Sequence, residues 1–377
     1  MTATADVLVI GGGMAGASAA AEMARDVRVI LLESEERPGY HSTGRSAAIF
    51  IQNYGNAVIR RLSKASRPLL LAPPFDPEGE SVLRPRGILH VANAGQAARL
   101  DELLATADGL HEITPEEALR HVPILRPERV ARAAYEADAM DIDVDRLHQG
   151  YLRGLRAAGG EVVCRAAVRR LARQDGLWRA ETGAGTFEAP LVVNAAGAWA
   201  DAVAAMAGLA PLGLQPLRRS AAILPAPPGH AVDGWPLTGD VEETYYFKPE
   251  AGKLMVSPAD ETPVAPHDAW PEDMDLAEGL DRFVSATRYE LHHVERSWAG
   301  LRTFAPDRTP VIGFDPLAEG FFWCAGQGGY GIQTAAAAAR LTAGLALGRG
   351  LPPALAQTGL DAAALSPARF RNVRDDA

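Results

Sequence analysis

Residues 5–16 have the sequence ADVLVIGGGMAG, and the rest of the chain can be interpreted outward from them. The apolar run at 7–10 is short and β-branched, which predicts a buried parallel strand. Gly11, Gly13 and Gly16 follow at the G-x-G-x-x-G spacing. This spacing allows a tight turn, the approach of a pyrophosphate to the backbone, and packing of the next helix on the strand. The pattern predicts a strand–loop–helix unit that binds a dinucleotide.

A second apolar strand predicted at 27–32 ends at Glu33. In dinucleotide-binding units an acidic residue at this position accepts the hydroxyls of the adenosine ribose. A carboxylate there would repel a 2′-phosphate. The sequence therefore predicts FAD or NAD as the cofactor and argues against NADP.

Composition narrows the class of protein. The 377 residues are enough for two domains, and 47 acidic against 37 basic side chains argue against nucleic acid as a partner. Two cysteines, Cys164 and Cys324, cannot form a disulfide framework and suggest a reducing compartment. We see neither a leader nor an apolar run long enough for a transmembrane segment. We expect a cytoplasmic protein and leave peripheral contact with the inner membrane open.

Dinucleotide-type elements recur in the middle and at the end of the chain. A buried strand at 191–194 runs into small residues, and an aromatic strand at 320–325 runs into GQGGYG and an alanine-rich helix predicted from Ile332. Between them, 218–224, 244–248 and 253–257 are typical of antiparallel strands. We predict an α/β (α+β) fold. A Rossmann-type FAD-binding domain would comprise 1–84, 145–217 and 302–377, and an antiparallel-sheet substrate-binding domain 85–144 and 218–301.

The sequence does not favour a metal site. His292 and His293 are adjacent on a helix predicted at 277–294, so their side chains would face two directions. The carboxylates of Asp141, Asp143 and Asp145 lack the other ligands of a calcium loop, so capping of the next helix is the better interpretation.

Several blocks, in order along nearly the whole chain, resemble the D-amino-acid oxidase superfamily of FAD-dependent oxidoreductases. The chain looks most similar to bacterial D-arginine and other D-amino-acid dehydrogenases. The blocks are 39–48 (GYHSTGRSAA), 147–154 (LHQGYLRG), 193–199, 214–220, 298–302 (WAGLR) and 327–334 (QGGYGIQT).

The resemblance implies FAD held without a covalent bond, because no cysteine precedes the block at 301–307, where related enzymes attach flavin. Its pyrophosphate would lie on the first glycine loop and its ribose on Glu33. The flavin ring would lie against 42–48, with the end of 328–334 beside it. The implied cofactor-binding residues are Gly11, Gly13, Met14, Ala15, Gly16, Glu33, Ser42, Thr43, Gly44, Arg45, Ser46, Ala47, Ala48, Val168, Ala196, Gly197, Trp199, Gly328, Gly329, Tyr330, Gly331, Ile332, Gln333 and Thr334.

The resemblance also assigns recognition of a substrate carboxylate to Arg302 and Arg219, since the guanidinium fork matches a carboxylate in two hydrogen bonds. Arg218 is expected to face solvent. Tyr246 and Tyr54 match positions that hydrogen-bond substrate. Neighbours on a strand face opposite ways, so only one of Tyr245 and Tyr246 can face the pocket, and we choose Tyr246.

The chain departs from D-arginine dehydrogenases where those enzymes recognise a cationic side chain. Ile88 replaces their glutamate and Ile49 their histidine. A buried cation without a counter-ion carries a severe penalty. We expect an apolar side chain to be favoured, in a pocket formed by Ile49, Ile51, Ile88, Leu237 and Gly329.

The activity implied is hydride transfer from the α-carbon of a D-amino acid to flavin N5, leaving an imino acid that hydrolyses to a 2-oxo acid and ammonia. The electron acceptor, dioxygen or quinone, stays open. The alternatives are a secondary-amine oxidase of the sarcosine or proline type, a 2-hydroxy-acid dehydrogenase, a flavoprotein that has lost catalysis, and an NAD dehydrogenase.

Overall fold

The computed structural model describes residues 2–76 and 79–371. Its first sheet has six strands, parallel except for the last. In spatial order they are β10 (Glu161–Val163), β3 (Val29–Leu32), β2 (Val7–Ile10), β14 (Leu191–Asn194), β22 (Phe321–Ala325) and β21 (Val311–Phe314). The predicted strand at 7–10 is confirmed, and the predictions at 191–194 and 320–325 fall on β14 and β22.

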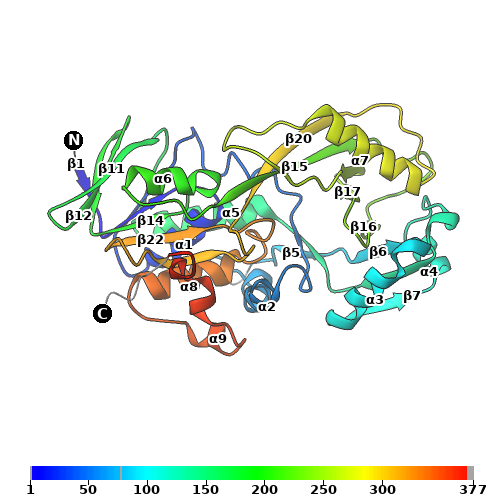
Figure 1. The fold of residues 1–377 in the computed structure, drawn as a ribbon, viewed down its shortest axis with the longest axis horizontal. Helices are drawn as coiled ribbons and strands as arrows, with labels where there is room; N and C mark the ends of the chain where they lie inside the picture. The colour runs from blue at the N-terminus through cyan, green and yellow to red at the C-terminus, as the bar shows by residue number, and fades with distance from the viewer. Residues whose placement is uncertain (1, 77–78, 372–377) are drawn as a thin grey trace.

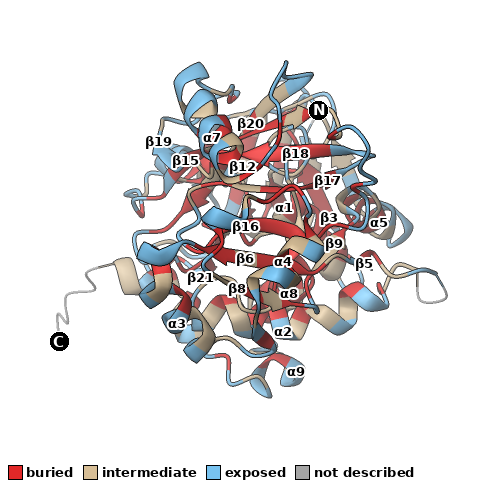
Figure 2. Ribbon diagram, turned by 90° about the vertical axis from the view of Figure 1, so that its right-hand side faces the viewer, coloured by how far each residue is buried: buried red, intermediate tan, exposed pale blue. Residues whose placement is uncertain are grey.

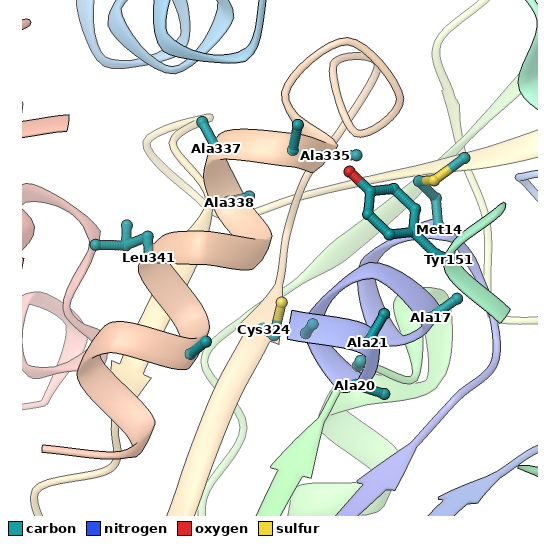
Figure 3. Close-up of a cluster of buried hydrophobic side chains, with 14 of the residues drawn as sticks. Met14, Ala17, Ala20, Ala21, Tyr151, Cys324, Ala335, Ala337, Ala338 and Leu341 are labelled. Atoms are coloured by element: carbon teal, nitrogen blue, oxygen red, sulfur yellow. The ribbon is translucent and has the colours of Figure 1, made fainter. Parts of the chain in front are cut away.

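One face of this sheet is covered by helices (Figure 1). α1 (Met14–Met23) packs against α8 (Ala335–Ala346) and α5 (Val144–Ala157). Figure 3 shows the buried cluster to which α1 contributes Ala17 and Ala20 and α8 contributes Ala337, and none of these three has exposed surface. Side chains of this size allow two helices to approach closely, which the close-packed interior of a protein requires. The helix after the glycine loop is therefore fixed to the sheet.

The opposite face carries a four-stranded sheet. Its strands, in order, are β1 (Thr2–Thr4), β13 (Gly185–Ala189), β12 (Leu177–Thr182) and β11 (Val168–Gln174). Leu8 and Ile10 of β2 face this layer, whereas Val7 and Val9 face the helices. Both faces of β2 are thus buried, which explains its continuous apolar run.

A nine-stranded mixed sheet forms the other end of the molecule (Figure 1). It combines strands from two distant parts of the chain, and the parallel pairing of β16 with β6 joins them. The strands are β19 (Thr262–Pro263), β15 (Gln215–Leu224), β18 (Lys253–Ser257), β17 (Tyr246–Glu250), β16 (Leu237–Asp240), β6 (Ile88–Ala92), β8 (Arg132–Glu136) and β7 (Leu110–Ile113), with β20 (Arg296–Phe304) on β15. Figure 2 shows β6 and β16 buried beneath more exposed helices. The proposed domain boundaries stay a prediction.

The remaining elements connect these sheets. A small sheet consists of β4 (Ile49–Phe50), β9 (Met140–Ile142) and β5 (Leu83–Pro85). The other helices are α2 (Ala57–Leu71), α3 (Ala97–Thr106), α4 (Pro115–His121), α6 (Ala200–Met206), α7 (Asp273–Ala286) and α9 (Pro353–Ala356), with short 3₁₀ turns at Ala94–Gln96, Pro127–Arg129, Gly197–Trp199, Ala362–Leu365 and Pro367–Phe370. No helix in the described ranges is long and apolar enough to cross a membrane.

Two helix predictions were wrong at their ends. α7 ends at Ala286, so His292 and His293 lie in the following loop and not on a helix. α8 begins at Ala335, three residues after the predicted start, because residues 331–334 form a turn. The capping role of Asp143 is confirmed, since its carboxylate accepts a hydrogen bond from Arg146 N at 3.0 Å.

Candidate active site

Two adjoining cavities lie between the six-stranded and nine-stranded sheets. The first, of about 560 Å³, extends over the ends of β2, β3 and β14. The second, of about 830 Å³, extends under the nine-stranded sheet. Both walls include Ser46, Ala47, Arg219, Tyr246, Arg302, Gly329 and Ile332. These residues mark where a ligand in one cavity can meet a ligand in the other.

The glycine loop borders the first cavity. Gly11 has φ +106°, and a Cβ there would lie 2.4 Å from Ala195 O, so only glycine lets the loop pass β14. A Cβ at Gly16 would lie 1.9 Å from Gly11 O, as expected of the glycine that lets the helix pack. At Gly13 a Cβ would meet only Thr43 Oγ1, at 3.4 Å, which leaves its backbone open to the cavity. The first amides of α1 have no helical carbonyl to bind, so they favour an anion there.

Glu33 is held firmly at the end of β3. Its Oε2 accepts from Gly12 N at 2.8 Å, and its Oε1 accepts from Glu35 N at 2.9 Å and Ser34 Oγ at 3.0 Å. The residue is buried but borders the cavity. Backbone donors therefore fix the orientation of a carboxylate that a ribose could reach.

The loop at 39–48 contributes mainly backbone to the first cavity, because its polar side chains bind other segments. Thr43 Oγ1 accepts from Met14 N at 2.9 Å, and Ser42 Oγ donates to Leu301 O at 2.6 Å. Arg45 donates to Ala299 O and forms an ion pair with Asp268. The loop is thereby tied to α1 and β20.

The structure brings most of the expected cofactor residues together. The wall of the first cavity contains Gly11, Gly13, Met14, Ala15, Glu33, Ser42, Thr43, Arg45, Ser46, Ala47, Val168, Ala196, Gly197, Trp199, Gly328, Gly329, Gly331 and Ile332. Ala48, Tyr330 and Gln333 line the second cavity instead.

Gly16, Gly44 and Thr334 line neither cavity. The Thr334 hydroxyl donates to Tyr330 O, and the Gln333 amide bonds to Ile51 backbone atoms and to Ser63 Oγ. Both side chains thus hold the turn before α8. The positive end of the α8 dipole begins at Ala335 and not at Ile332.

Arg302 of β20 stands at the junction of the two cavities. Its Nη1 lies 3.5 Å from the Tyr54 hydroxyl, and no carboxylate within the described residues forms an ion pair with it. Burial opposes its charge, but the phenols of Tyr54 and Tyr246 and, more weakly, the carboxylate of Glu261 outweigh this and hold the pKa of Arg302 above its ordinary value. The guanidinium stays charged and can receive an anion.

The two tyrosines differ in their protonation behaviour. Burial raises the pKa of Tyr54 despite the nearby Arg302. For Tyr246 burial acts in the same direction, but Arg302 and Arg219 outweigh it and lower the pKa. Tyr245 packs into the core on the opposite face of the sheet, in line with the choice of Tyr246.

Arg219 lies at the cavities as expected, whereas Arg218 does not lie where it was expected. Arg219 borders both cavities, but Glu261 Oε1 lies 3.2 Å from its Nη2, and its Nε donates to Asp260 O. Arg218 does not face solvent as expected. It is buried and pairs with Glu272 at 3.0 Å and Asp275 at 2.7 Å, because alternation along β15 turns it under the residues around α7.

The expected apolar pocket residues form one cluster. Ile51, Ile88, Leu237 and Ala139 are buried together, with Ile49, Tyr54 and Tyr246 against them. These residues come from four separate chain segments. We call this cluster the aliphatic patch.

Comparison with known proteins identifies the kind of protein to which this site belongs. The family model described as "FAD dependent oxidoreductase" (DAO) matches residues 6–345. The chain belongs to this family. Its cofactor is FAD, as predicted.

Relatives of this flavoenzyme have diverged widely in sequence. It is 25% identical to "FAD-dependent oxidoreductase domain-containing protein 1" of Bos taurus, over 91% of this chain and 81% of that protein. It is also 25% identical to glycine oxidase of Geobacillus kaustophilus, over 88% and 90%. The crystal structure of that oxidase has a TM-score of 0.80 at 22% identity, covering 93% of this chain and 99% of the other. L-proline dehydrogenase from P. horikoshii has a TM-score of 0.81 at 21% identity, covering 98% of each chain. The fold prediction is confirmed, and the closer resemblance to D-arginine dehydrogenase stays a prediction.

The residues present fit FAD. The Gly13 backbone leaves room at the start of α1 for a pyrophosphate, and Glu33 offers a fixed acceptor for a ribose. Neither cysteine lines a cavity. Cys324 is buried in β22, and Cys164 follows β10. No thiol is therefore placed to bond a flavin.

His148 is a contributor that the sequence argument did not single out. Its Nε2 lies 2.9 Å from Gly12 O, which requires that this nitrogen carry the proton. Burial lowers the pKa of His148, so the ring is neutral at physiological pH. The ring also lies against Gly39, where a Cβ would be 2.9 Å from its Cε1. His148 thus supports the glycine loop and the segment after Glu33. The only signal in the sequence was its place in the resembling block at 147–154.

Proposed function

We propose that this flavoenzyme oxidises an amine that carries a carboxylate, with a D-amino acid of apolar side chain as the favoured substrate. The observation that carries the proposal is Arg302, a charged guanidinium at the junction of the two cavities without a carboxylate partner among the described residues. A carboxylate substrate supplies the missing charge and matches the guanidinium fork.

The protein's part in the reaction is to bind and orient. Arg302 would hold the carboxylate, and the hydroxyls of Tyr54 and Tyr246 would fix it from the side. FAD, when bound, accepts the hydride. The substrate must present a neutral amine, whose lone pair forms the C=N bond as the Cα–H bond breaks. Water then adds to the released imino acid, giving a 2-oxo acid and ammonia. Positioning of this kind supplies a large share of a catalysed rate.

The aliphatic patch supports an apolar side chain next to the reacting carbon. Ile88 is 5% exposed and Leu237 6% exposed, so both are buried against their neighbours. An ammonium group on a short stem would lose its water there without gaining a partner, which is costly. A branched or linear hydrocarbon would instead be favoured by its burial.

A second candidate is oxidation of a small or secondary amine acid. Glycine oxidase is a relative over most of this chain, and L-proline dehydrogenase has the same fold. Both names denote amine substrates with a carboxylate, which Arg302 would bind in the same way. In the first candidate the aliphatic patch contacts the apolar side chain of the substrate, whereas a small or secondary amine acid has no such side chain to place there.

Anaerobic titration of the holoprotein distinguishes the candidates. The flavin absorption should bleach with D-leucine and D-norvaline, and little with L-leucine or with D-2,3-diaminopropionate, whose ammonium would lie on the patch. Bleaching by N-methylglycine or proline but not by D-leucine would establish the second candidate. If no amine acid bleaches the flavin, both fail, and 2-hydroxy acids become the next substrates to examine.

A further inference from the structure

The second cavity continues past the aliphatic patch to a buried carboxylate. Glu136, on β8, pairs directly with Ile88 of β6, so both side chains lie on the same face of the sheet. Glu136 is only 2% exposed and lines the cavity. Its Oε2 accepts a hydrogen bond from Asn53 Nδ2 at 2.9 Å. A buried carboxylate therefore lies next to the aliphatic patch, on the strand that pairs with β6.

His90 of β6 lies on the same face of the sheet as Glu136 and diagonal to it, because it pairs with Ala134 of β8. Burial lowers the pKa of His90 to about 4, so its ring is neutral at physiological pH. No hydrogen bond to the ring is formed by any described residue, and the ring borders the cavity. Its neighbour on β16 is Gly239, which adds no side chain to the wall. A neutral ring and a carboxylate thus share one end of the cavity.

Two basic residues, Arg60 and Arg99, also line this end of the cavity, and Arg99 has a carboxylate partner. Arg60 donates to Gly55 O at 3.0 Å and to Thr106 O at 2.8 Å, and Arg99 pairs with Glu102 at 3.0 Å. Glu242 and Glu243 also line the cavity. Arg60 keeps its charge and acts on Glu136, but three glutamates line this end, so the balance of charge favours a cation over an anion.

We infer that Glu136, with His90 and Asn53 beside it, forms a distal subsite for a terminal ammonium or guanidinium on a long substrate. This inference rests on the proposed function, because Arg302 would hold the carboxylate at the other end. β17, β16, β6 and β8 are consecutive in the sheet. Tyr246 aligns with His90 and Ala134 across these strands, so Glu136 lies two residues further along β8. The backbones of Tyr246 and Glu136 are therefore roughly 16 Å apart. Side chains reaching in from both ends leave a span that an extended chain of about five carbons can bridge.

The distal subsite refines the preference set by the aliphatic patch. The methylene groups of a long side chain would lie on Ile88 and Leu237, and only the terminal charge would pass beyond them. A short cationic chain cannot reach Glu136 and remains disfavoured. The enzyme would thus accept substrates with apolar or long cationic side chains and reject substrates with short cationic side chains.

Binding of compounds that cannot be oxidised tests the subsite apart from the reaction. Calorimetry on the FAD-loaded protein compares 6-aminohexanoate with hexanoate, which has the same carboxylate and carbon chain but no ammonium. The expected result is at least tenfold tighter binding of 6-aminohexanoate. Glu136→Gln should abolish this advantage and leave the affinity for hexanoate unchanged. The glutamine keeps an acceptor for Asn53, so the fold is preserved.

Asp138→Asn is the matched control. It removes the same charge two residues away, on a side chain that is 76% exposed and lines neither cavity. It should keep the tenfold preference. Equal affinities of the two compounds in the wild type, or equal loss of both in Glu136→Gln, would overturn the inference. Because no turnover is involved, this result is separate from the anaerobic titration. Reduction by D-leucine with no preference for 6-aminohexanoate would leave the proposed function standing and remove the distal subsite.

Discussion

Gly329 lies against the guanidinium of Arg302. A Cβ built on Gly329 would be 2.9 Å from Nη1 and 3.2 Å from Cζ of Arg302, closer than side chains normally pack. The two residues come from different segments, β20 and the turn before α8. Glycine at 329 thus gives the guanidinium the space to stand at the junction of the cavities.

Gly329→Ala should impair substrate binding without removing FAD. The added methyl displaces the guanidinium by a few tenths of an ångström, and displacements approaching 1 Å can cost about 100-fold in efficiency. We expect kcat/KM for D-leucine to fall by about tenfold or more in steady-state assays, with FAD still bound to the variant. Wild-type efficiency in this variant would indicate that Arg302 does not hold the carboxylate.

Arg302→Lys should weaken carboxylate recognition specifically. Lysine keeps the charge but lacks the planar fork. Loss of a buried charged hydrogen-bond partner costs about 2–5 kcal/mol. We therefore expect the dissociation constant of D-leucine, from the anaerobic titration, to rise about 30-fold or more. Arg308→Lys is the control, since Arg308 lines the same cavity but pairs with Glu261 at 2.9 Å. Equal losses in the two variants would contradict the assignment.

Glu33→Ala should lower the affinity for FAD. The change removes the acceptor for the ribose and leaves Gly12 N without its partner, and an unsatisfied buried donor costs about 1–3 kcal/mol. Fluorescence titration of the apoprotein with FAD should show a dissociation constant at least about tenfold higher. Glu36→Ala, on an exposed residue paired with Arg165, should bind FAD as the wild type does. If Glu33→Ala bound FAD with unchanged affinity, the adenosine ribose would not be held by Glu33.

Arg218→Met should destabilise the fold and spare the flavin site. Asp260, 6% exposed at its side chain, lies 3.7 Å from Arg218, and removing one partner of a buried pair costs about 3 kcal/mol or more. Urea unfolding should show this loss, while FAD content at low urea stays the same. An unchanged midpoint would mean that the ion pairs contribute nothing to stability.

Stability should fall in weak acid, in part through His90. Its folded pKa of about 4 lies below the unfolded value near 6.5. Between these values the unfolded chain binds a proton that the folded chain does not, so stability decreases as pH falls from 6.5 to 4, by at most about 1.4 kcal/mol per pH unit. Thermal unfolding of His90→Gln across this range should show a shallower slope. If the stability of the variant fell more steeply with decreasing pH than that of the wild type, His90 would not contribute to the loss of stability in acid.

Local patterns determined the cofactor half of this protein. The glycine spacing at 11–16, the strand before it and Glu33 after the next strand all lie within about thirty residues, so their geometry follows from a single strand–loop–helix unit. The same holds for the Asp143 cap. Within one such unit, the spacing of residues in the sequence largely determines where they lie in space.

Tertiary structure decided the rest. Arg302 and Tyr54 meet across 248 positions of sequence, and Glu136 lies opposite Ile88 only through the pairing of β8 with β6. The sequence argument missed this carboxylate because it considered position 88 alone. It also placed Arg218 in solvent, since which face of β15 is covered depends on α7 and its flanking residues. Alternation along a strand is set locally, but what covers each face depends on the packing of distant segments.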